Sequence, residues 1–279
     1  MAVLMPEPKN TLLGKDTVYS DRYNPDLLQP IPRSLGRDAI GDHDFRGVDI
    51  WRLYELSWLT PEGLPQTAVG ELLVPASTHS IVESKSLKLY AGSFAMTRVS
   101  GIEEVACRMT EDLSSRLGGR VEVRLYPAAQ YPGAMQSMPG TSLDDLALTA
   151  GNLVQLYDVE PAFLKFDEDN GTVDETYSTT VFRSLCPVTG QPDLASILIR
   201  YTGRAIDKAG LFKSLVSYRC HKGFHEQCVE QIFHDMRAAF APDVLEVYAC
   251  FTRRGGIDIN PFRSTRRNSP EQILREVRQ

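Results

Sequence analysis

The turn that decides the fold of this chain reads Leu185-Cys186-Pro187-Val188-Thr189-Gly190-Gln191-Pro192-Asp193. The run before it, 179–182, is β-branched and aromatic, and the run after it, 194–201, is mostly apolar. Prolines and a glycine interrupt the stretch between these runs, which predicts a β-hairpin. Cys186 and Asp193 would lie at the two ends of its turn, where a thiolate nucleophile and a proton-transferring carboxyl group can face one pocket. A cysteine at a strand end is also a common small core residue, so both interpretations stay open.

The segments after this hairpin indicate a mixed structure. Residues 205–219 have no single periodicity, but 225–240 predict a strong helix. Its apolar stripe consists of Val229, Ile232, Phe233, Met236 and Phe240. Residues 244–251 then read as another strand.

The first half of the chain repeats this order of strands, helix and strand. Expected strands lie at 51–59 and 70–74, an expected helix at 102–117, and an alternating strand at 121–126. The stretch 87–99 begins as a strand-like segment. We therefore predict an α+β fold with two tandem modules. The expected units are an N-terminal arm over 1–40, a first module over 41–145 and a second module over 146–279.

Composition excludes several classes of protein. The chain has 279 residues, 42% of them hydrophobic, and a net charge of −6, which argues against a dedicated nucleic-acid binder. No apolar run approaches the length that crosses a bilayer, and the first ten residues do not form a signal peptide. The five cysteines have no regular spacing, which is typical of reduced thiols. We expect a cytoplasmic protein with no membrane or nucleic-acid partner.

A second segment rich in functional groups reads Glu83-Ser84-Lys85-Ser86-Leu87-Lys88-Leu89-Tyr90. It can be a strand, or a helix start at which Ser84 or Ser86 caps the backbone. A carboxylate there can accept two N–H bonds from a heterocycle, and lysines suit phosphate. The alternative is a solvated, charged strand edge.

The start of the helix at 225 is a third candidate. Phe224 offers an aromatic platform, His225 a proton-handling imidazole, and Glu226 a carboxylate able to hold a base. A histidine and a glutamate at a helix N-terminus are also a common capping choice. A rival interpretation makes zinc ligands of Cys220, His221, His225 and Cys228.

The last candidate is Arg253-Arg254-Gly255-Gly256-Ile257-Asp258. Two guanidiniums beside a glycine pair can clamp a phosphate. No G-x-G-x-x-G follows a strand, so a dinucleotide would not be held in Rossmann fashion. The later arginines at 263, 266 and 267 are expected to belong to a solvated tail.

Taken together, these segments form one ordered pattern. It consists of Pro30-Ile31-Pro32-Arg33; Glu83 to Tyr90 with Ser93-Phe94 and Thr97-Arg98; Ser184-Leu185-Cys186-Pro187 with Gln191-Pro192-Asp193; Phe224-His225-Glu226-Gln227-Cys228; and Tyr248 through Arg253-Arg254-Gly255-Gly256-Ile257-Asp258-Ile259-Asn260-Pro261. The pattern resembles the NADPH-dependent 7-cyano-7-deazaguanine reductases, the nitrile reductases of queuosine biosynthesis in tRNA modification. The order resembles their long, two-module type. The resemblance implies the tunnelling fold, in which antiparallel sheets carry helices on one face, and a homodimer.

The resemblance also implies a site and a reaction. Cys186 would form a covalent thioimide with the nitrile carbon, Asp193 would act as acid and base, and His225 would help to supply protons. The implied substrate-binding residues are Glu83, Ser84, Lys85, Phe224, His225 and Glu226. The implied contacts to NADPH, two of which are used per turnover, are Lys85, Ser86, Arg254 and Gly255. The partner would be a free deazapurine, with no resident metal.

Three other functions remain as alternatives to a reductase. A tunnelling-fold zinc hydrolase acting on a purine would use Cys220, His221 or His225, and Cys228. A non-catalytic protein would bind the purine and leave NADPH unoxidised. A cysteine hydrolase would use the same thioimide but end in attack by water.

Overall fold

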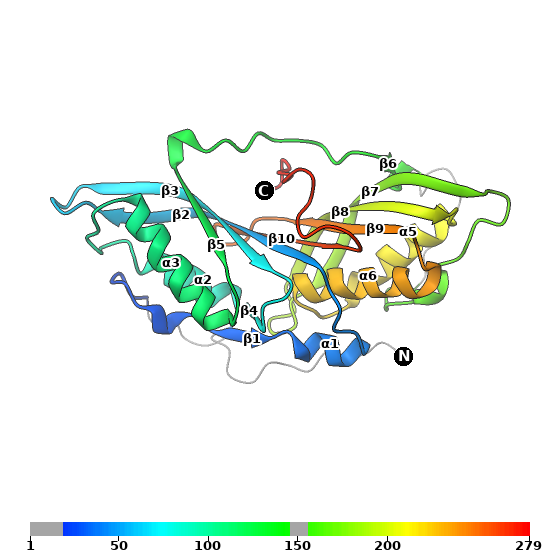
Figure 1. Ribbon diagram of the computed structural model, residues 1–279, viewed down its shortest axis with the longest axis horizontal. Coiled ribbons are helices and arrows are strands. Elements are labelled where there is room, and N and C mark those ends of the chain that lie inside the picture. Colours follow the sequence, from blue (N-terminus) through cyan, green and yellow to red (C-terminus); the bar gives the residue numbers. More distant parts are fainter. Residues whose placement is uncertain (1–18, 146–155) are drawn as a thin grey trace.

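The computed structural model describes residues 19–145 and 156–279. Its largest feature is one eight-stranded sheet, in which the strands follow the order β5-β3-β2-β10-β9-β8-β7-β6 (Figure 1). Neighbouring strands are antiparallel except β6 and β7, which are parallel. The helices lie along one face of this sheet, and the C-terminal segment crosses the other face.

The first half of the chain contributes a hairpin, two helices and a strand. These are β2 (Gly47–Leu59), β3 (Pro65–Pro75), α2 (Ser84–Gly92), α3 (Ile102–Leu117) and β5 (Glu122–Pro127). Helix α3 buries four apolar side chains at helical spacing, namely Val105, Met109, Leu113 and Leu117. It ends at Gly118, whose φ of 67° lies in the left-handed region that favours glycine at a helix end.

The second half repeats this order and adds a strand. Its elements are β7 (Thr172–Leu185), β8 (Pro192–Arg204), α5 (Lys208–Ser217), α6 (His225–Phe240), β9 (Val244–Phe251) and β10 (Ile257–Ser264). Strand β10 pairs with β2 of the first half, from Ile257 opposite Leu53 to Arg263 opposite Gly47. This pairing joins the two halves into one sheet.

Short elements connect the N-terminal region to both halves. Strands β1 (Pro30–Pro32) and β4 (Ser80–Val82) form a small antiparallel sheet, and α1 (Ser34–Ile40) follows β1. The other short elements are β6 (Thr141–Ser142), η1 (Pro25–Leu27), η2 (Ala128–Gln130), η3 (Pro161–Phe163) and η4 (Tyr218–Cys220). The β1–β4 pair holds the N-terminal segment beside the start of α2, where Glu83 N donates to Gln29 O at 2.9 Å.

Two main apolar clusters lie in the two halves. The cluster of the second half includes Phe182, Ile197, Phe233 and Phe251, and that of the first half includes Trp51, Leu72, Leu87 and Met109. Burial of one such side chain contributes about 1.5–3 kcal/mol. A smaller cluster joins Tyr248 and Phe262 to Leu274 of the C-terminal segment. The shared sheet is therefore packed on both sides of the β2–β10 junction, which fixes the positions of the residues there.

The predicted α+β class, with two tandem halves and helices on one face, is confirmed. The strand-like interpretation of 87–99 is wrong, because helix α2 occupies 84–92 and buries Leu87, Tyr90 and Ala91. The expected solvated tail is also wrong at Arg263, which lies fully buried in β10. The bounds of the arm and modules stay a prediction. Residues 1–18 of that arm and the boundary at residue 146 lie outside the described residues.

Within the described ranges, no helix combines the length and the apolar character that would let it cross a membrane.

Candidate active site

A cavity of about 230 Å³ lies where the two halves meet. Strands β2 and β10 supply apolar walls from Trp51, Ile257 and Ile259. Its polar lining comes from α2, the β7–β8 turn, the start of α6 and the β9–β10 connection. These residues are Ser84, Lys85, Lys88, Cys186, Thr189, Gln191, Asp193, His225, Glu226, Thr252 and Arg254. The cavity therefore gathers most of the chemically active segments that the sequence singled out.

Cys186 is fixed by the tight turn between β7 and β8. Its N donates to Gln191 O at 2.9 Å, and Gly190 N donates to Cys186 O at 3.0 Å. Gly190 has a φ of 69°, a conformation that glycine adopts without a steric cost. Leu185 N also donates to His221 O at 2.8 Å, which ties the turn to the segment before α6. Cys186 is 7% exposed and lines the cavity, so a ligand in the cavity can reach this residue.

Asp193 lies between an imidazole and a guanidinium. His225 Nε2 is 3.4 Å from Asp193 Oδ2. Arg254 forms an ion pair with the other carboxylate oxygen and donates to Pro192 O at 3.0 Å. The His225 ring stacks on Phe251, with centroids 3.8 Å apart and planes 9° apart. Phe251 therefore sets the plane of the imidazole, and Asp193 sets the direction in which its Nε2 points.

Glu226 lies in the first turn of α6 and is 2% exposed. Its Oε1 has no hydrogen-bond partner within the described part of the chain. Burial raises the pKa of Glu226 to about 8, and the nearby Asp49 carboxylate contributes to this increase. The capping function belongs to a different side chain, since Gln227 Oε1 accepts from Phe224 N at 3.0 Å. Glu226 is thus a buried acid group that lines the cavity, and among the described residues nothing pairs with its Oε1.

Helix α2 begins with a carboxylate cap rather than a serine cap. Glu83 Oε1 accepts from Lys85 N and Oε2 accepts from Ser86 N, both at 2.8 Å. The expectation that Ser84 or Ser86 caps this helix is therefore wrong. Glu83 is fully buried and lies outside the cavity lining, although Ser84 and Lys85 belong to it. Burial raises the pKa of Glu83 above its ordinary value.

Ser86 also lies behind the cavity wall. Its hydroxyl donates to Glu83 O at 2.7 Å and accepts from Gln29 N at 3.0 Å. Of the predicted site residues, the structure brings nine together in the cavity lining. They are Ser84, Lys85, Cys186, Asp193, Phe224, His225, Glu226, Arg254 and Gly255. Glu83 and Ser86 lie outside this lining and form hydrogen bonds at the start of α2.

Cationic side chains from two elements line the same cavity. Lys85 and Lys88 come from α2, and Arg254 comes from the connection between β9 and β10. Gly255 has a φ of 59°, and a β-carbon there would lie 3.1 Å from Lys88 Nζ. The glycine therefore lets this connection approach α2 closely. The residues present fit a phosphate-bearing cofactor, because positive charge and close backbone approach both favour phosphate.

Several residues in and next to the cavity were not predicted as site residues from the sequence. Lys88 has a readable signal, since it follows Lys85 at the i+3 spacing that places two side chains on one helix face. Ile257 and Ile259 alternate along β10, as wall residues on one face of a strand do. Phe251 has no local signal, because its contact with His225 depends on the packing of β9 against α6.

The described residues give the zinc alternative no ligand set. Across 19–145 and 156–279, no three His, Cys, Asp or Glu side chains lie close enough together to hold a metal ion. Cys220 is exposed, whereas Cys228 is fully buried. Burial lowers the pKa of His221 to about 4, so its imidazole is neutral at pH 7.

Comparisons with known proteins agree along nearly the whole chain. A family model described as "Nitrile reductase, 7-cyano-7-deazaguanine-reductase N-term" matches residues 19–125, and one described as "QueF-like protein" matches 192–270. Proteins named NADPH-dependent 7-cyano-7-deazaguanine reductase from Burkholderia thailandensis and Burkholderia lata are each 46% identical over 276 residues. These alignments cover 98% of this chain and 99% of each relative. A solved structure, the archaeosine synthase QueF-Like in the apo form, is 19% identical with a TM-score of 0.30. It covers 34% of this chain and 92% of that chain.

Proposed function

The chain belongs to the family of NADPH-dependent 7-cyano-7-deazaguanine reductases, and we propose that it reduces the nitrile through a covalent thioimide on Cys186. It is an NADPH-dependent oxidoreductase. The proposed product is 7-aminomethyl-7-deazaguanine, used in queuosine biosynthesis. Conversion of a nitrile to a primary amine takes four electrons.

One observation carries the covalent route. Cys186, Asp193 and His225 line one small cavity, and the imidazole and carboxylate lie 3.4 Å apart. A nucleophile needs a proton-handling group within hydrogen-bond reach, and that group is in turn oriented by a third. The β7–β8 turn holds Cys186, and the start of α6 holds His225. Phe251 stacks on the His225 ring, and Asp193 contacts its Nε2.

The first step is attack by the Cys186 sulfur on the nitrile carbon. A C–S bond forms, one C–N π bond breaks, and the nitrile nitrogen takes a proton. The resulting C=N group accepts hydride more readily than the bare nitrile does, which is the benefit of covalent catalysis here. After the first reduction the C–S bond breaks, and Cys186 returns to a thiolate while the bound molecule becomes an imine.

Asp193 and His225 handle the protons in this scheme. The Asp193 carboxylate orients His225 through Nε2, and both residues line the same cavity as Cys186. A proton can then pass to the nitrile nitrogen as sulfur adds, without water entering the site. The stacking on Phe251 keeps the ring in this plane while the ligand changes.

The deazaguanine base is held by groups at the start of α6. Glu226 offers a carboxyl oxygen that has no hydrogen-bond partner in residues 19–145 and 156–279, which suits the N–H groups of the base. Phe224 covers the ring. A buried carboxylate discriminates well, because an analogue that lacks the N–H leaves a charge unpaired. Contact of the base with Glu83 remains part of the proposal, since each carboxylate oxygen that caps α2 has a second lone pair.

NADPH is assigned to the cationic side of the cavity. Lys85, Arg254 and Gly255 are the predicted contacts, and Lys88 joins them. Bound there, the cofactor supplies the hydrides, two per turnover. Ser86 was also predicted to contact it, and the hydrogen bonds of its hydroxyl to Glu83 and Gln29 favour a supporting function under Lys85.

The wider setting of the enzyme is also proposed from the family. We retain the arm over 1–40, the modules over 41–145 and 146–279, a homodimer, and a cytoplasmic location. The substrate is a free small molecule, so the site requires no direct contact with tRNA. The net charge of −6 agrees with this expectation.

Product analysis tests the reaction. The full chain is mixed with NADPH and 7-cyano-7-deazaguanine, and oxidised cofactor and product are quantified by absorbance and mass spectrometry. We expect two NADPH oxidised for each aminomethyl product. An amide formed without NADPH oxidation would indicate the cysteine hydrolase. Base binding with no oxidation would indicate a binding protein, and stoichiometric zinc in active protein would indicate the hydrolase.

A further inference from the structure

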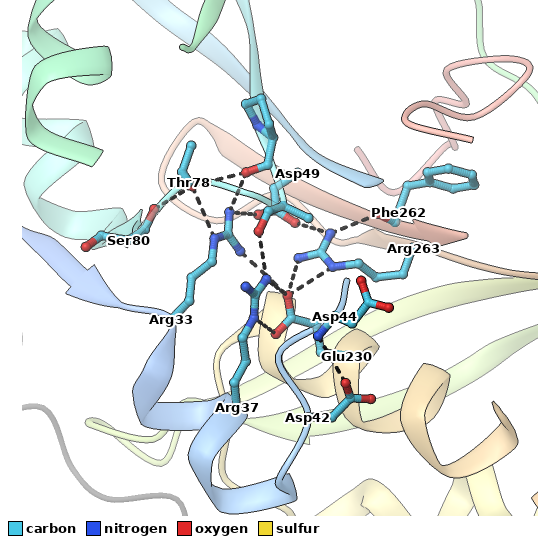
Figure 2. Close-up of polar contacts among 12 residues, drawn as sticks. Arg33, Arg37, Asp42, Asp44, Asp49, Thr78, Ser80, Glu230, Phe262 and Arg263 are labelled. Atoms are coloured by element: carbon cyan, nitrogen blue, oxygen red, sulfur yellow. Dashed lines mark hydrogen bonds and ion pairs between the residues drawn. The ribbon is translucent and has the colours of Figure 1, made fainter. Parts of the chain in front are cut away.

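A buried ion cluster lies one helical turn from the cavity. It consists of Arg33, Arg37, Asp49, Glu230 and Arg263 (Figure 2). Arg33 Nη2 lies 2.6 Å from Asp49 Oδ2, and Arg263 Nη1 lies 2.7 Å from Asp49 Oδ1. Glu230 Oε1 is 2.7 Å from Arg37 Nη2 and 2.8 Å from Arg263 Nη2. All five side chains are buried, so water does not screen these charges.

Four parts of the chain meet in this cluster. Arg33 is the N-cap residue of α1 and Arg37 lies within it, Asp49 lies in β2, Glu230 in α6 and Arg263 in β10. Arg33 also donates to Thr78 Oγ1 at 3.1 Å and Pro75 O at 3.2 Å. The N-terminal arm is therefore anchored by charge at the junction of the two halves, on the same strand pair that walls the cavity.

Glu226 and Glu230 are four residues apart on α6, so they lie on one face of the helix. Glu230 is held by arginines, whereas Glu226 Oε1 has no hydrogen-bond partner in the described structure. In the same region Arg33 Nη1 is buried without a hydrogen-bond partner among the described residues, and it lies 3.8 Å from Glu230 Oε1. One acidic and one cationic group near the cavity are thus incompletely paired.

The charges in the cluster do not balance. Three arginines face two carboxylates, which leaves one positive charge in excess. Asp42 does not offset it, because Asp42 pairs with Arg237 and with His234 Nδ1 at 2.9 Å. An ionised Glu226 would bring the count to three carboxylates and three arginines.

We propose that Arg33 and Arg263 are positioning residues that stabilise Glu226 as a carboxylate when the N–H groups of the base reach it, so that base binding releases a proton. This inference rests on the proposed function. It makes the arm, through Arg33, a part of the substrate site although Arg33 does not line the cavity. It also explains why a net positive cluster lies buried beside a buried acid group.

The acid–base behaviour of Glu226 agrees with this geometry. Burial and then Asp49 raise its pKa, Arg33 and Arg263 lower it, and the balance is a pKa of about 8. Glu226 is therefore mostly protonated at pH 7 in the free protein. Other charged groups around it are Glu230 on α6, Asp49 on β2, Arg263 on β10, Lys85 on α2, and Asp193 with its partner His225.

The test is the pH dependence of base affinity. The full chain carrying Cys186→Ala, which cannot form the thioimide, is titrated with 7-cyano-7-deazaguanine by calorimetry from pH 6 to pH 9. We expect affinity to rise about tenfold per pH unit and to level off near pH 8, where Glu226 no longer has a proton to lose. A Glu226→Gln version should show a flat profile.

Two arginine variants separate electrostatics from folding. Arg33→Met removes the charge, so the pH at which base affinity levels off should rise by about one unit. Arg37→Met removes another buried arginine of the same cluster, which binds Glu230. In this variant base affinity should still level off near pH 8. Arg33→Lys keeps the charge and should restore the parent profile. Equal profiles for Arg33→Met and Arg37→Met would overturn the proposal.

Asp49→Asn is a second test of the proposal, to be used if Arg33→Met does not fold. Loss of this carboxylate removes a charge that raises the pKa of Glu226, so the levelling should move below pH 8. An unchanged profile in Asp49→Asn, or affinity independent of pH in the Cys186→Ala parent, would overturn the proposal. Failure of the parent to bind the base at any pH would instead contradict the proposed function.

Discussion

Glu226 and Glu230 make a direct comparison between two regions of one helix. Both glutamates are buried on the same face of α6. Burial alone would raise the pKa of Glu230, but Arg263, Arg37 and Arg33 lower it below its ordinary value. Glu226 lacks such direct partners, and its pKa is raised to about 8. The same residue type is thus a structural anion in the ion cluster and an available acid group in the cavity.

This difference predicts whether each region contributes mainly to activity or to stability. In the ion cluster almost every polar atom has a protein partner, so a substitution leaves an uncompensated buried charge. In the cavity, His225 Nδ1 and Glu226 Oε1 have no partner within the described residues. Substitutions in the cavity should therefore cost activity, and substitutions in the cluster should cost stability.

The strongest expected contrast is at Cys186. Cys186→Ala should lower turnover to the background rate, because the thioimide cannot form, while the melting temperature stays near that of the wild type. Steady-state NADPH oxidation and thermal unfolding measure the two effects. The exposed Cys220 lies outside the cavity lining, and Cys220→Ala should keep full turnover. Turnover by Cys186→Ala would remove this cysteine from the mechanism.

A smaller loss of activity is expected at Asp193. Asp193→Asn keeps the shape but loses the charge that orients His225, so kcat should fall by about 10²–10⁴-fold, as for other acid–base groups. The Kd of NADPH should change far less, because the acid–base group acts on the nitrile nitrogen. Single-turnover rates and cofactor titration separate the two effects. Equal losses in both would place Asp193 in cofactor binding.

A substitution in the ion cluster should lower the free energy of unfolding. Arg263→Met leaves Asp49 and Glu230 short of a partner, so the free energy of unfolding should fall by about 3–5 kcal/mol. Arg266→Met, at an exposed arginine three residues further on, should change it by less than about 0.5 kcal/mol. Denaturant unfolding measures both. A similar stability for the two variants would mean that the buried pairs contribute little.

The smallest effect expected is a change in the pH dependence of stability at Glu226. Because its pKa is raised from 4.5 to about 8 in the folded state, the folded protein binds more protons than the unfolded chain between these values, and stability falls as pH rises through them. Glu226→Gln should therefore be more stable than the wild type at pH 8 by at least about 1 kcal/mol, and the difference should be several-fold smaller at pH 5. Unfolding at the two pH values checks this; an equal difference at both would contradict it.

Local signals in the sequence predicted much of the site. The prolines and glycine around Cys186 mark a tight turn, and the β7–β8 hairpin forms there. The apolar stripe after His225 predicted α6 with its observed bounds, 225–240. These features depend on neighbours within a few residues, so the periodicity of one segment is enough to find them.

The errors have two sources, one in long-range contacts and one in a local helix cap. Arg263 was expected in a solvated tail, but its partner Asp49 lies 214 residues away and is brought near by the β2–β10 pairing. At α2, Ser84 and Ser86 were expected as caps, whereas the preceding Glu83 caps the helix with both carboxylate oxygens. Charge in a sequence does not reveal burial, and burial decides whether an arginine holds the fold or binds a ligand.

The proposed mechanism depends on a covalent bond between Cys186 and the nitrile carbon. Intact-protein mass spectrometry after incubation with 7-cyano-7-deazaguanine and no NADPH tests it directly. We expect one adduct with the full mass of the base, on the Cys186 peptide, and none on Cys186→Ala. Wild-type protein that binds the base but gains no mass, or an adduct that persists on Cys186→Ala, would show that Cys186 does not form the covalent bond.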